Sequence, residues 1–274
     1  MSEITYRTSN KVASIHIDAA GRGNKFTPEL RQELSQTLER FKADEQAWVG
    51  VISSAGSDFC LGSADTPPSS ETDRRERFRL WAGGHFEIWK PLIVAIQGQC
   101  KGEGLALALA CDLRVAAEDT TLQAGYMGSP DEPELVGPWL LHLVGLAKTF
   151  EILWTDSVVT INDALNLGLV NRVVLKGQPD AISPEGRLPM RPLQPITRVA
   201  DGSVELGAMA LAEELLLNGP VTQSFQKEVA YRSIGIPFHY AQSLEFSVDP
   251  LASQDRVEGT RAFVENRRPV WRRR

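Results

Sequence analysis

Apolar positions in the first hundred residues recur with two different spacings. Residues 11–18 alternate apolar and polar side chains, as in a strand with one buried face. Thr27 followed by Pro28 is typical of a helix start, and the apolar positions after it have helical spacing. These positions are Leu30, Leu34, Leu38 and Phe41. Short apolar runs at 48–53 and 92–96 are typical of strands buried in a parallel sheet.

The rest of the first two thirds continues this alternation of strands and helices. A strand is expected at 112–116. Helical spacing occurs at 71–90, at 105–111 after a glycine-rich turn, at 139–152 and at 161–167. Strands alternating with helices predict an α/β fold.

Residues 175–203 interrupt the pattern because they carry five prolines and little periodicity. We interpret this segment as an insertion without regular structure. The chain is therefore divided into an α/β core, residues 1–200, which contains the insertion, and a C-terminal helical region, residues 204–274.

Composition narrows the class of protein. The net charge is −6, so no overall basic field would recruit nucleic acid. The three cysteines form no C-x-x-C pair, which argues against a disulfide scaffold and against a zinc site. The first ten residues lack a signal pattern, and apolar runs such as 105–111 are too short to cross a bilayer. We expect a soluble cytoplasmic protein without a nucleic-acid or membrane partner.

Six short motifs follow one another along the chain. They are residues 59–65 (FCLGSAD), 90–98 (KPLIVAIQG), 102–112 (GEGLALALACD), 133–145 (PELVGPWLLHLVG), 163–174 (DALNLGLVNRVV) and 253–263 (SQDRVEGTRAF). In this order they resemble the crotonase superfamily, also called enoyl-CoA hydratase/isomerase. The resemblance covers nearly the whole chain except 66–80 and 175–203. It implies a ββα-spiral core with C-terminal helices used for trimerisation, and a homotrimer or a hexamer built as a dimer of trimers. It also implies an acyl-CoA substrate, with coenzyme A as part of the substrate and no further cofactor or metal.

The resemblance places an oxyanion hole at the backbone N–H groups of Ser63 and Glu103. Such donors stabilise an enolate formed from the thioester, and each is worth about 2.7–4 kcal/mol. The N–H group at position 103 would lie at a helix start, where N–H groups lack helical partners and the dipole favours an anion. The family usually has Gly or Ala at this position. The Glu103 side chain either points away from the substrate, which we favour, or crowds the thioester.

The acids of the hydratase branch are missing. Their positions fall on Ala106 and Tyr126, so ordinary hydration of a 2-enoyl-CoA is not expected. The isomerase branch uses one acid further along, which corresponds to Glu134. A single carboxylate can take a proton from one carbon and return it two carbons away. The neighbours Asp131 and Glu132 are interpreted as surface charges, although a shift of one residue would promote either of them.

Substrate binding is assigned to a small set of further residues. These are Asn24, Ala64, Asp65, Trp81, His85, Tyr126 and Phe263. His85 and Trp81 could instead belong to an ordinary packed helix face, which the helical spacing favours. The arginines from Arg267 to Arg274 could attract CoA phosphates, but such a tail is more often solvated.

The pattern as a whole indicates an enoyl-CoA isomerase-like enzyme that moves a double bond from Δ3 to Δ2. Neither a G-x-S-x-G elbow nor a G-x-G-x-x-G turn occurs, which disfavours serine hydrolase and nicotinamide chemistry. Two alternatives stay open. One is a divergent C–C bond hydrolase or lyase of the same fold, and the other is a catalytically silent family member that binds acyl-CoA.

Overall fold

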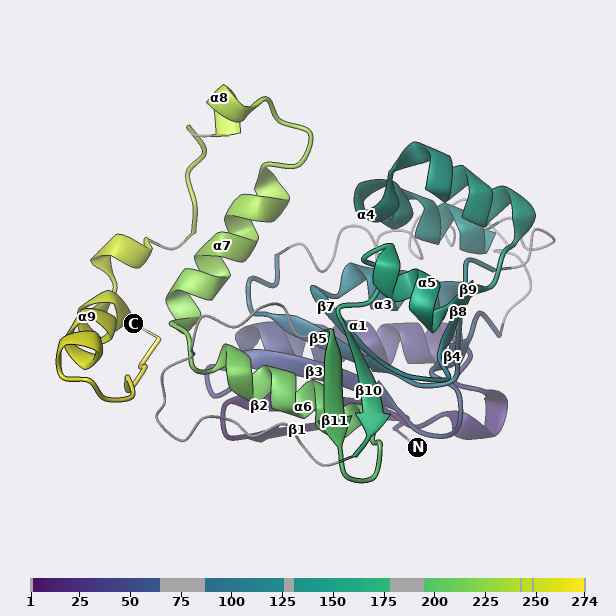
Figure 1. The fold of residues 1–274 in the computed structure, drawn as a ribbon, viewed down its shortest axis with the longest axis horizontal. Coiled ribbons are helices and arrows are strands. Elements are labelled where there is room, and N and C mark those ends of the chain that lie inside the picture. The colour runs from purple at the N-terminus through teal and green to yellow at the C-terminus, as the bar shows by residue number, and fades with distance from the viewer. Residues whose placement is uncertain are drawn as a thin grey trace.

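The computed structural model describes residues 2–64, 87–125, 131–177, 195–241, 243–247 and 249–273. Two β-sheets with helices packed around them make up most of the molecule, and a group of C-terminal helices extends to one side (Figure 1).

The larger sheet has seven strands within the described residues. In spatial order they are β1 (Ile4–Ser9), β2 (Val12–Ile17), β3 (Val49–Ser54), β5 (Leu92–Ile96), β7 (Leu113–Ala117), β10 (Arg172–Lys176) and β11 (Ile196–Val199). Strands β1 and β2 are antiparallel, and all later neighbours in the sheet are parallel. The strands expected at 11–18, 48–53, 92–96 and 112–116 are therefore confirmed to within two residues at each end.

The smaller sheet consists of short strands in the order β4 (Cys60–Leu61), β6 (Gln99–Lys101), β8 (Thr121–Gln123) and β9 (Val159–Thr160). The chain passes from β3 to β4, from β5 to β6 and from β7 to β8. Each turn of this spiral adds one strand to each sheet. The ends of β4 and β6 are thereby brought side by side, and the predicted oxyanion-hole residues follow directly after them.

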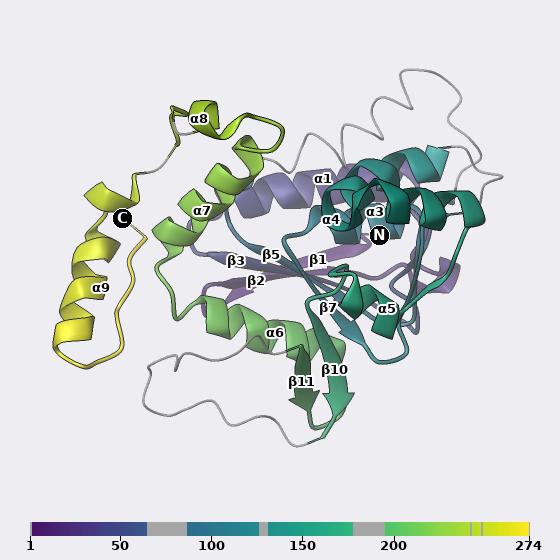
Figure 2. The same cartoon turned by 45° about the horizontal axis from the view of Figure 1, so that its top comes forward.

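Both faces of the larger sheet are buried. Ile52 belongs to an apolar cluster shared with helix α1 (Pro28–Ala43), whereas Val51 belongs to a second cluster shared with helix α6 (Val204–Leu215). Figure 2 shows α1 and α6 on opposite faces of the sheet. Burial on both faces explains why these strands are continuous apolar runs rather than alternating ones. Helix α6 therefore covers the α/β core, although the sequence division assigned it to the C-terminal region.

Helix α1 forms as the sequence predicts. The Thr27 hydroxyl accepts a hydrogen bond from the N–H group of Leu30 at 3.2 Å, and Pro28 occupies the first turn. The four apolar positions expected on its inner face are all buried, namely Leu30, Leu34, Leu38 and Phe41.

Helix α4 (Asp131–Thr155) begins eight residues before the predicted helix at 139–152 and is interrupted at Gly145, where φ is 75°. Its stretch from Leu135 to Thr155 is long and apolar enough to cross a membrane by length and composition alone, whereas the apolar runs of the sequence were expected to be too short. Its residues Leu135, Val136 and Leu140 lie in the main apolar cluster, together with residues of helix α3 (Glu103–Ala110). Packing against α3 accounts for this part of its apolar character.

The expectation of no regular structure over 175–203 was wrong at both ends. Strand β10 continues to Lys176, and β11 (Ile196–Val199) pairs with it in parallel, with Val173 opposite Ile196. Pro195 lies just before β11, and a proline normally argues against a strand. It is accepted here because it stands where the pairing begins, with its carbonyl accepting from the N–H group of Val173. Residues 178–194 lie outside the described part of the chain.

The helix predicted at 161–167 is α5 (Ile161–Asn166). The chain then ends in α7 (Pro220–Arg232), the short α8 (Phe238–Ala241) and α9 (Gln254–Val264).

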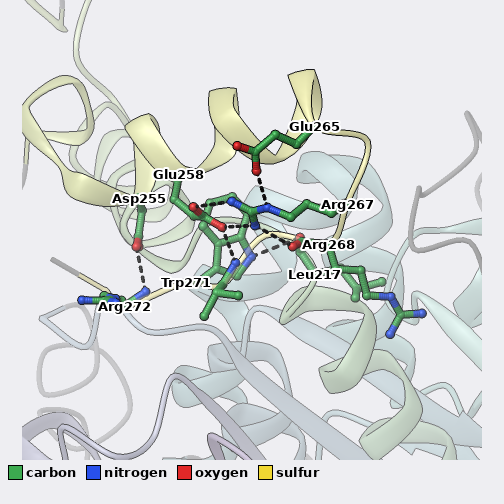
Figure 3. A network of polar contacts seen from close by, with 9 residues as sticks. Leu217, Asp255, Glu258, Glu265, Arg267, Arg268, Trp271 and Arg272 are labelled. Atoms are coloured by element: carbon green, nitrogen blue, oxygen red, sulfur yellow. Dashed lines mark hydrogen bonds and ion pairs between the residues drawn. The ribbon is translucent and has the colours of Figure 1, made fainter.

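The basic tail folds back on α9 (Figure 3). Arg267 forms ion pairs with Glu258 and Glu265, both at 2.6 Å, and Asp255 accepts from the N–H group of Arg272 at 2.9 Å. The tail is therefore anchored rather than free in solvent.

Candidate active site

The residues expected to form an oxyanion hole lie next to each other. In the parallel pair β4–β6, Cys60 lies opposite Cys100 and Leu61 opposite Lys101. Continuing this register by two residues sets Ser63 beside Glu103. One nitrogen of Arg31 bonds to both side chains, at 2.9 Å from the Ser63 hydroxyl and 2.8 Å from the Glu103 carboxylate. The spiral thus brings together two positions that are 40 residues apart in the sequence.

A glycine with positive φ precedes each of the two positions. The φ angle is 96° at Gly62 and 50° at Gly102, a region that side chains other than glycine rarely adopt. Gly102 is also the N-terminal cap of α3, so Glu103 is the first residue of the helix. The N–H groups of a first helical turn have no acceptor within the helix, and the helix dipole favours negative charge there. This local geometry suits the role that the sequence predicts for the backbone of Glu103.

Helix α3 approaches β4 so closely that only glycine fits at position 104. A Cβ atom on Gly104 would lie 2.4 Å from the Cβ atom of Cys60 and 2.8 Å from its sulfur atom. An ordinary contact between such atoms is 3.4–4 Å. The absence of a side chain at position 104 therefore sets the distance between the start of α3 and β4.

The segment around Ser63 is held from its other side by residue 26. The N–H group of Phe26 donates to the carbonyl of Gly62 at 2.9 Å, and the N–H group of Ala64 donates to the carbonyl of Phe26 at 2.9 Å. These bonds form a parallel bridge between Phe26 and Ser63. Ser63 is half-buried and Ala64 is exposed, so this segment reaches the surface of the molecule.

The side chain of Glu103 points toward α1. Both of its carboxylate oxygens accept from Arg31, at 2.6 Å from Nε and 2.8 Å from the terminal nitrogen. The side chains of Arg31 and Glu103 are 8% and 1% exposed, so this is a buried, bidentate ion pair. The carboxylate is thus held against α1, while the prediction that it points away from the substrate stays a prediction.

Arg31 is the residue that sequence reasoning missed. It follows buried Leu30 in the first turns of α1 and was hidden among the polar residues of an amphipathic helix. A signal was present at Glu103, because a carboxylate at a position usually held by Gly or Ala needs a cation once it is buried. The sequence alone does not say which of the 29 lysines and arginines supplies it.

Asn24 supports the loop that leads to the site. Its side-chain oxygen accepts from the N–H group of Ala19 at 3.0 Å, and its nitrogen donates to the carbonyls of Ala55 and Asp58 at 2.7 and 3.0 Å. The residue is 2% exposed and has a φ of 52°. Its amide thus joins the turn at 19–24 to the loop at 55–58, while its assignment to substrate binding stays a prediction.

Phe263 is not near the other site residues within one chain. It lies on α9 with 75% of its surface exposed, and both views place α9 at a distance from α3 (Figures 1 and 2). Four further residues assigned to substrate binding, Asp65, Trp81, His85 and Tyr126, lie outside the described residues.

The backbone of Glu134 belongs to the first turn of α4, and its side chain lies outside what the structure describes. The next residues, Leu135 and Val136, are buried in the same apolar cluster as Ala106 of α3. The start of α4 therefore packs close to α3. Ala106 itself is fully buried and offers no acid at the first hydratase position.

Two of the buried cysteines, Cys100 and Cys111, are not activated. Burial raises the pKa of the Cys100 thiol well above its usual value, and neighbouring Cys60 adds to this shift. Burial also raises the pKa of Cys111 to about 12. Both thiols are therefore protonated at neutral pH and are poor nucleophiles. Among the described residues, no group of three His, Cys, Asp or Glu side chains could hold a metal ion.

Comparison with known proteins agrees with this geometry. The family model for enoyl-CoA hydratase/isomerase matches residues 7–180, which is more than half of the chain. An (E)-benzylidenesuccinyl-CoA hydratase from Thauera aromatica is 26% identical over 277 residues, covering 98% of each chain. A carnitinyl-CoA dehydratase from Escherichia coli K12 is 27% identical over 296 residues, covering all of both chains.

The fold is also that of known structures. An enoyl-CoA hydratase from Bacillus anthracis covers 100% of both chains with a TM-score of 0.82 and 22% sequence identity. This likeness confirms the predicted crotonase-type α/β spiral with C-terminal helices.

Proposed function

Because the chain belongs to the enoyl-CoA hydratase/isomerase family, we propose that it moves a carbon–carbon double bond within an enoyl-CoA thioester. The family and its relatives support an enzyme that acts on acyl-CoA. The choice of isomerisation rests on which acids the active site contains.

The thioester carbonyl would accept hydrogen bonds from the backbone N–H groups of Ser63 and Glu103. Removal of a proton from C2 of a 3-enoyl-CoA then forms a dienolate, whose negative charge builds up on the carbonyl oxygen. Two donors at that oxygen stabilise the transition state more than the ground state, because the negative charge develops only in the transition state. The positions of Ser63 and Glu103, side by side after β4 and β6, support this role.

Glu134 would act as the proton shuttle. Its carboxylate takes the C2 proton, the double bond moves from C3–C4 to C2–C3, and the resulting carboxylic acid returns the proton to C4. The reaction needs no net acid, base or water, so one carboxylate is sufficient.

The observation that carries this choice is the state of the acids on α3. Glu103 is the one acidic residue within α3, and both of its carboxylate oxygens are bonded to Arg31. Ala106 takes the first hydratase position and is enclosed in the apolar core. The pairing of Glu103 and the burial of Ala106 support a base that comes from another element than α3.

The test is a panel of 3-enoyl-CoA and 2-enoyl-CoA thioesters of increasing chain length, followed by ultraviolet absorbance and by chromatography of the products. We expect 3-enoyl-CoA to be converted to the conjugated 2-enoyl-CoA. Replacing Glu134 by Gln should lower kcat by about 10²–10⁴-fold. The matched controls Asp131→Asn and Glu132→Gln remove a neighbouring carboxylate and should leave kcat nearly unchanged. Equal turnover by wild type and Glu134→Gln would refute the shuttle, and a loss in either control would move the role to that residue.

Hydration is the second candidate, because the curated relatives quoted above are named as a hydratase and a dehydratase. The same panel separates the two reactions. Hydration of a 2-enoyl-CoA adds the mass of water and removes the conjugated absorbance, whereas isomerisation leaves the mass unchanged.

A further inference from the structure

We propose that Arg31 is a positioning residue that fixes the distance between the two sides of the oxyanion hole and neutralises the charge of Glu103. This inference rests on the thioester-binding part of the proposed function, and it does not depend on whether the reaction is isomerisation or hydration.

Arg31 contacts both sides of the predicted hole. Its guanidinium donates to the Glu103 carboxylate at 2.6 and 2.8 Å, to the Ser63 hydroxyl at 2.9 Å and to the Phe26 carbonyl at 3.2 Å. Phe26 is in turn bridged to the backbone on either side of Ser63. A planar guanidinium with several fixed donors can hold such a set in one geometry, whereas a single ammonium cannot. A shift of either β4 or α3 would therefore break bonds to Arg31.

The bonds from Arg31 to Glu103, Ser63 and Phe26 are called the clamp below. The backbone that carries Arg31 is itself held in place. The backbone N–H group of Arg31 donates to the carbonyl of Thr27 at 3.0 Å, inside the capped first turn of α1. Leu30 and Leu34 beside it are fully buried. Groups held on a packed helix are more precisely placed than groups on a loop.

The charge of Arg31 matters as much as its shape. Glu103 bears a negative charge on the same residue whose N–H group would face a developing oxyanion. Without a cation, that buried carboxylate would repel the transition state while leaving the neutral thioester nearly unaffected. The bidentate pair with Arg31 removes this repulsion. The proposed reaction therefore tolerates a glutamate at position 103, where the family usually has Gly or Ala. Loss of Arg31 should therefore lower kcat far more than it raises KM.

The experiment compares Arg31→Met, Glu103→Ala and the double variant with wild type. The control is Arg172→Met, because Arg172 also forms a bidentate pair, with Glu214 at 2.8 and 2.8 Å, but lies on β10 of the larger sheet, whereas the site follows β4 and β6 of the smaller one. The readouts are kcat and KM on the best substrate of the panel, and the absorption spectrum of bound cinnamoyl-CoA. Hydrogen bonds to the carbonyl oxygen polarise this conjugated thioester and shift its absorption to longer wavelength.

We expect Arg31→Met to lower kcat by about 100-fold or more, with KM changed by less than about threefold. The red shift of bound cinnamoyl-CoA should shrink in parallel. Removing the carboxylate as well, in the double variant, should recover at least about tenfold of kcat, since the repulsion is gone and only the clamp is missing. Arg172→Met should change kcat and the red shift little. If Arg31→Met does not fold, Arg31→Lys takes its place. It keeps the charge but cannot bond to Glu103 and Ser63 together, so a smaller red shift is expected.

The outcomes separate this inference from the proposed function. If wild type turns over and the Arg31 variants match Arg172→Met in both readouts, the clamp is refuted and the function stands. If wild type does not turn over but shows a red shift that the Arg31 variants lose, the clamp stands and the proposed reaction fails. An equal red shift in wild type and Arg31 variants, or no red shift in wild type, overturns the inference.

Discussion

Replacing Gly104 by Ala tests whether the contact between α3 and β4 controls the site. The new Cβ atom would lie 2.4 Å from the Cβ atom of Cys60 and 2.8 Å from its sulfur atom. An ordinary contact begins at 3.4 Å, so the first of these distances is about 1 Å too short. A Cβ atom is fixed to the backbone and cannot rotate away, so α3 or β4 has to move.

Two opposing effects set the change in stability. Alanine in place of glycine inside a helix is worth up to about 1 kcal/mol in favour of the variant. Overpacking of a close contact costs about 1–3 kcal/mol. With the full gain subtracted, we expect Gly104→Ala to lower the free energy of unfolding by up to about 2 kcal/mol. Activity is the sharper readout, because a displacement of about 1 Å at reacting groups can cost about 10²-fold in rate.

Urea unfolding and steady-state kinetics measure these two effects. The control is Gly137→Ala in α4, where the added Cβ atom would meet Leu153 at an ordinary 3.6 Å. This control should be as stable as wild type or slightly more stable, with unchanged kcat. Cys60→Gly removes both clashing atoms, so combining it with Gly104→Ala should recover activity relative to Gly104→Ala alone. A Gly104→Ala protein with wild-type stability and wild-type kcat would refute the reasoning.

Two further predictions concern groups that the proposed chemistry does not use. The three buried cysteines should resist iodoacetamide in the native protein at pH 8 and react fully in denaturant, because burial raises the pKa of thiols such as Cys111. Mass spectrometry after alkylation would count the labelled thiols. Rapid labelling of the native protein would contradict the burial. The bond to Arg267 lowers the pKa of Glu258 from 4.5 to about 2, so docking of the C-terminal tail should be complete above pH 4.5 and be lost as the pH falls through 2. The amide signal of Val270, whose N–H group donates to Glu258, would report this titration by NMR, and a midpoint near 4.5 would contradict the prediction.

Much of the fold could be predicted from local pattern. Helix α1 combines a cap, a proline and four buried positions, and all of these signals agree. Strands β3 and β5 are apolar on both faces because helices cover the sheet from both sides. Such consistency between local signals is what makes an element predictable.

The elements that were missed have weak local signals. Strand β1 is at the edge of the sheet and mostly exposed, so it lacks an apolar pattern. Strand β11 is four residues long, is partly exposed and follows a proline. Both strands form because a neighbour in the sheet offers hydrogen bonds, and that neighbour is not visible in the strand's own sequence.

The candidate site was predictable only where it follows the backbone of a motif. The positions of Ser63 and Glu103 came from resemblance, and the spiral does bring them together. The orientation of the Glu103 side chain depended on Arg31, which is 72 residues away in the sequence and shares no pattern with it. Contacts of this kind are fixed by the packing of one helix on another, so no periodicity reveals them.

The same distinction explains how the site can tolerate an acid at position 103. A backbone N–H group is present whatever the side chain is, so the proposed chemistry constrains the path of the chain more than the identity of the residue. The path is held by Gly104, which admits α3 close to β4, and by Arg31, which ties the two segments to α1. A buried carboxylate without its cation is strongly destabilising, by about 3–5 kcal/mol. Glu103 and Arg31 should therefore be replaceable only together. The variant that combines Arg31→Met with Glu103→Ala should be more stable than Arg31→Met alone.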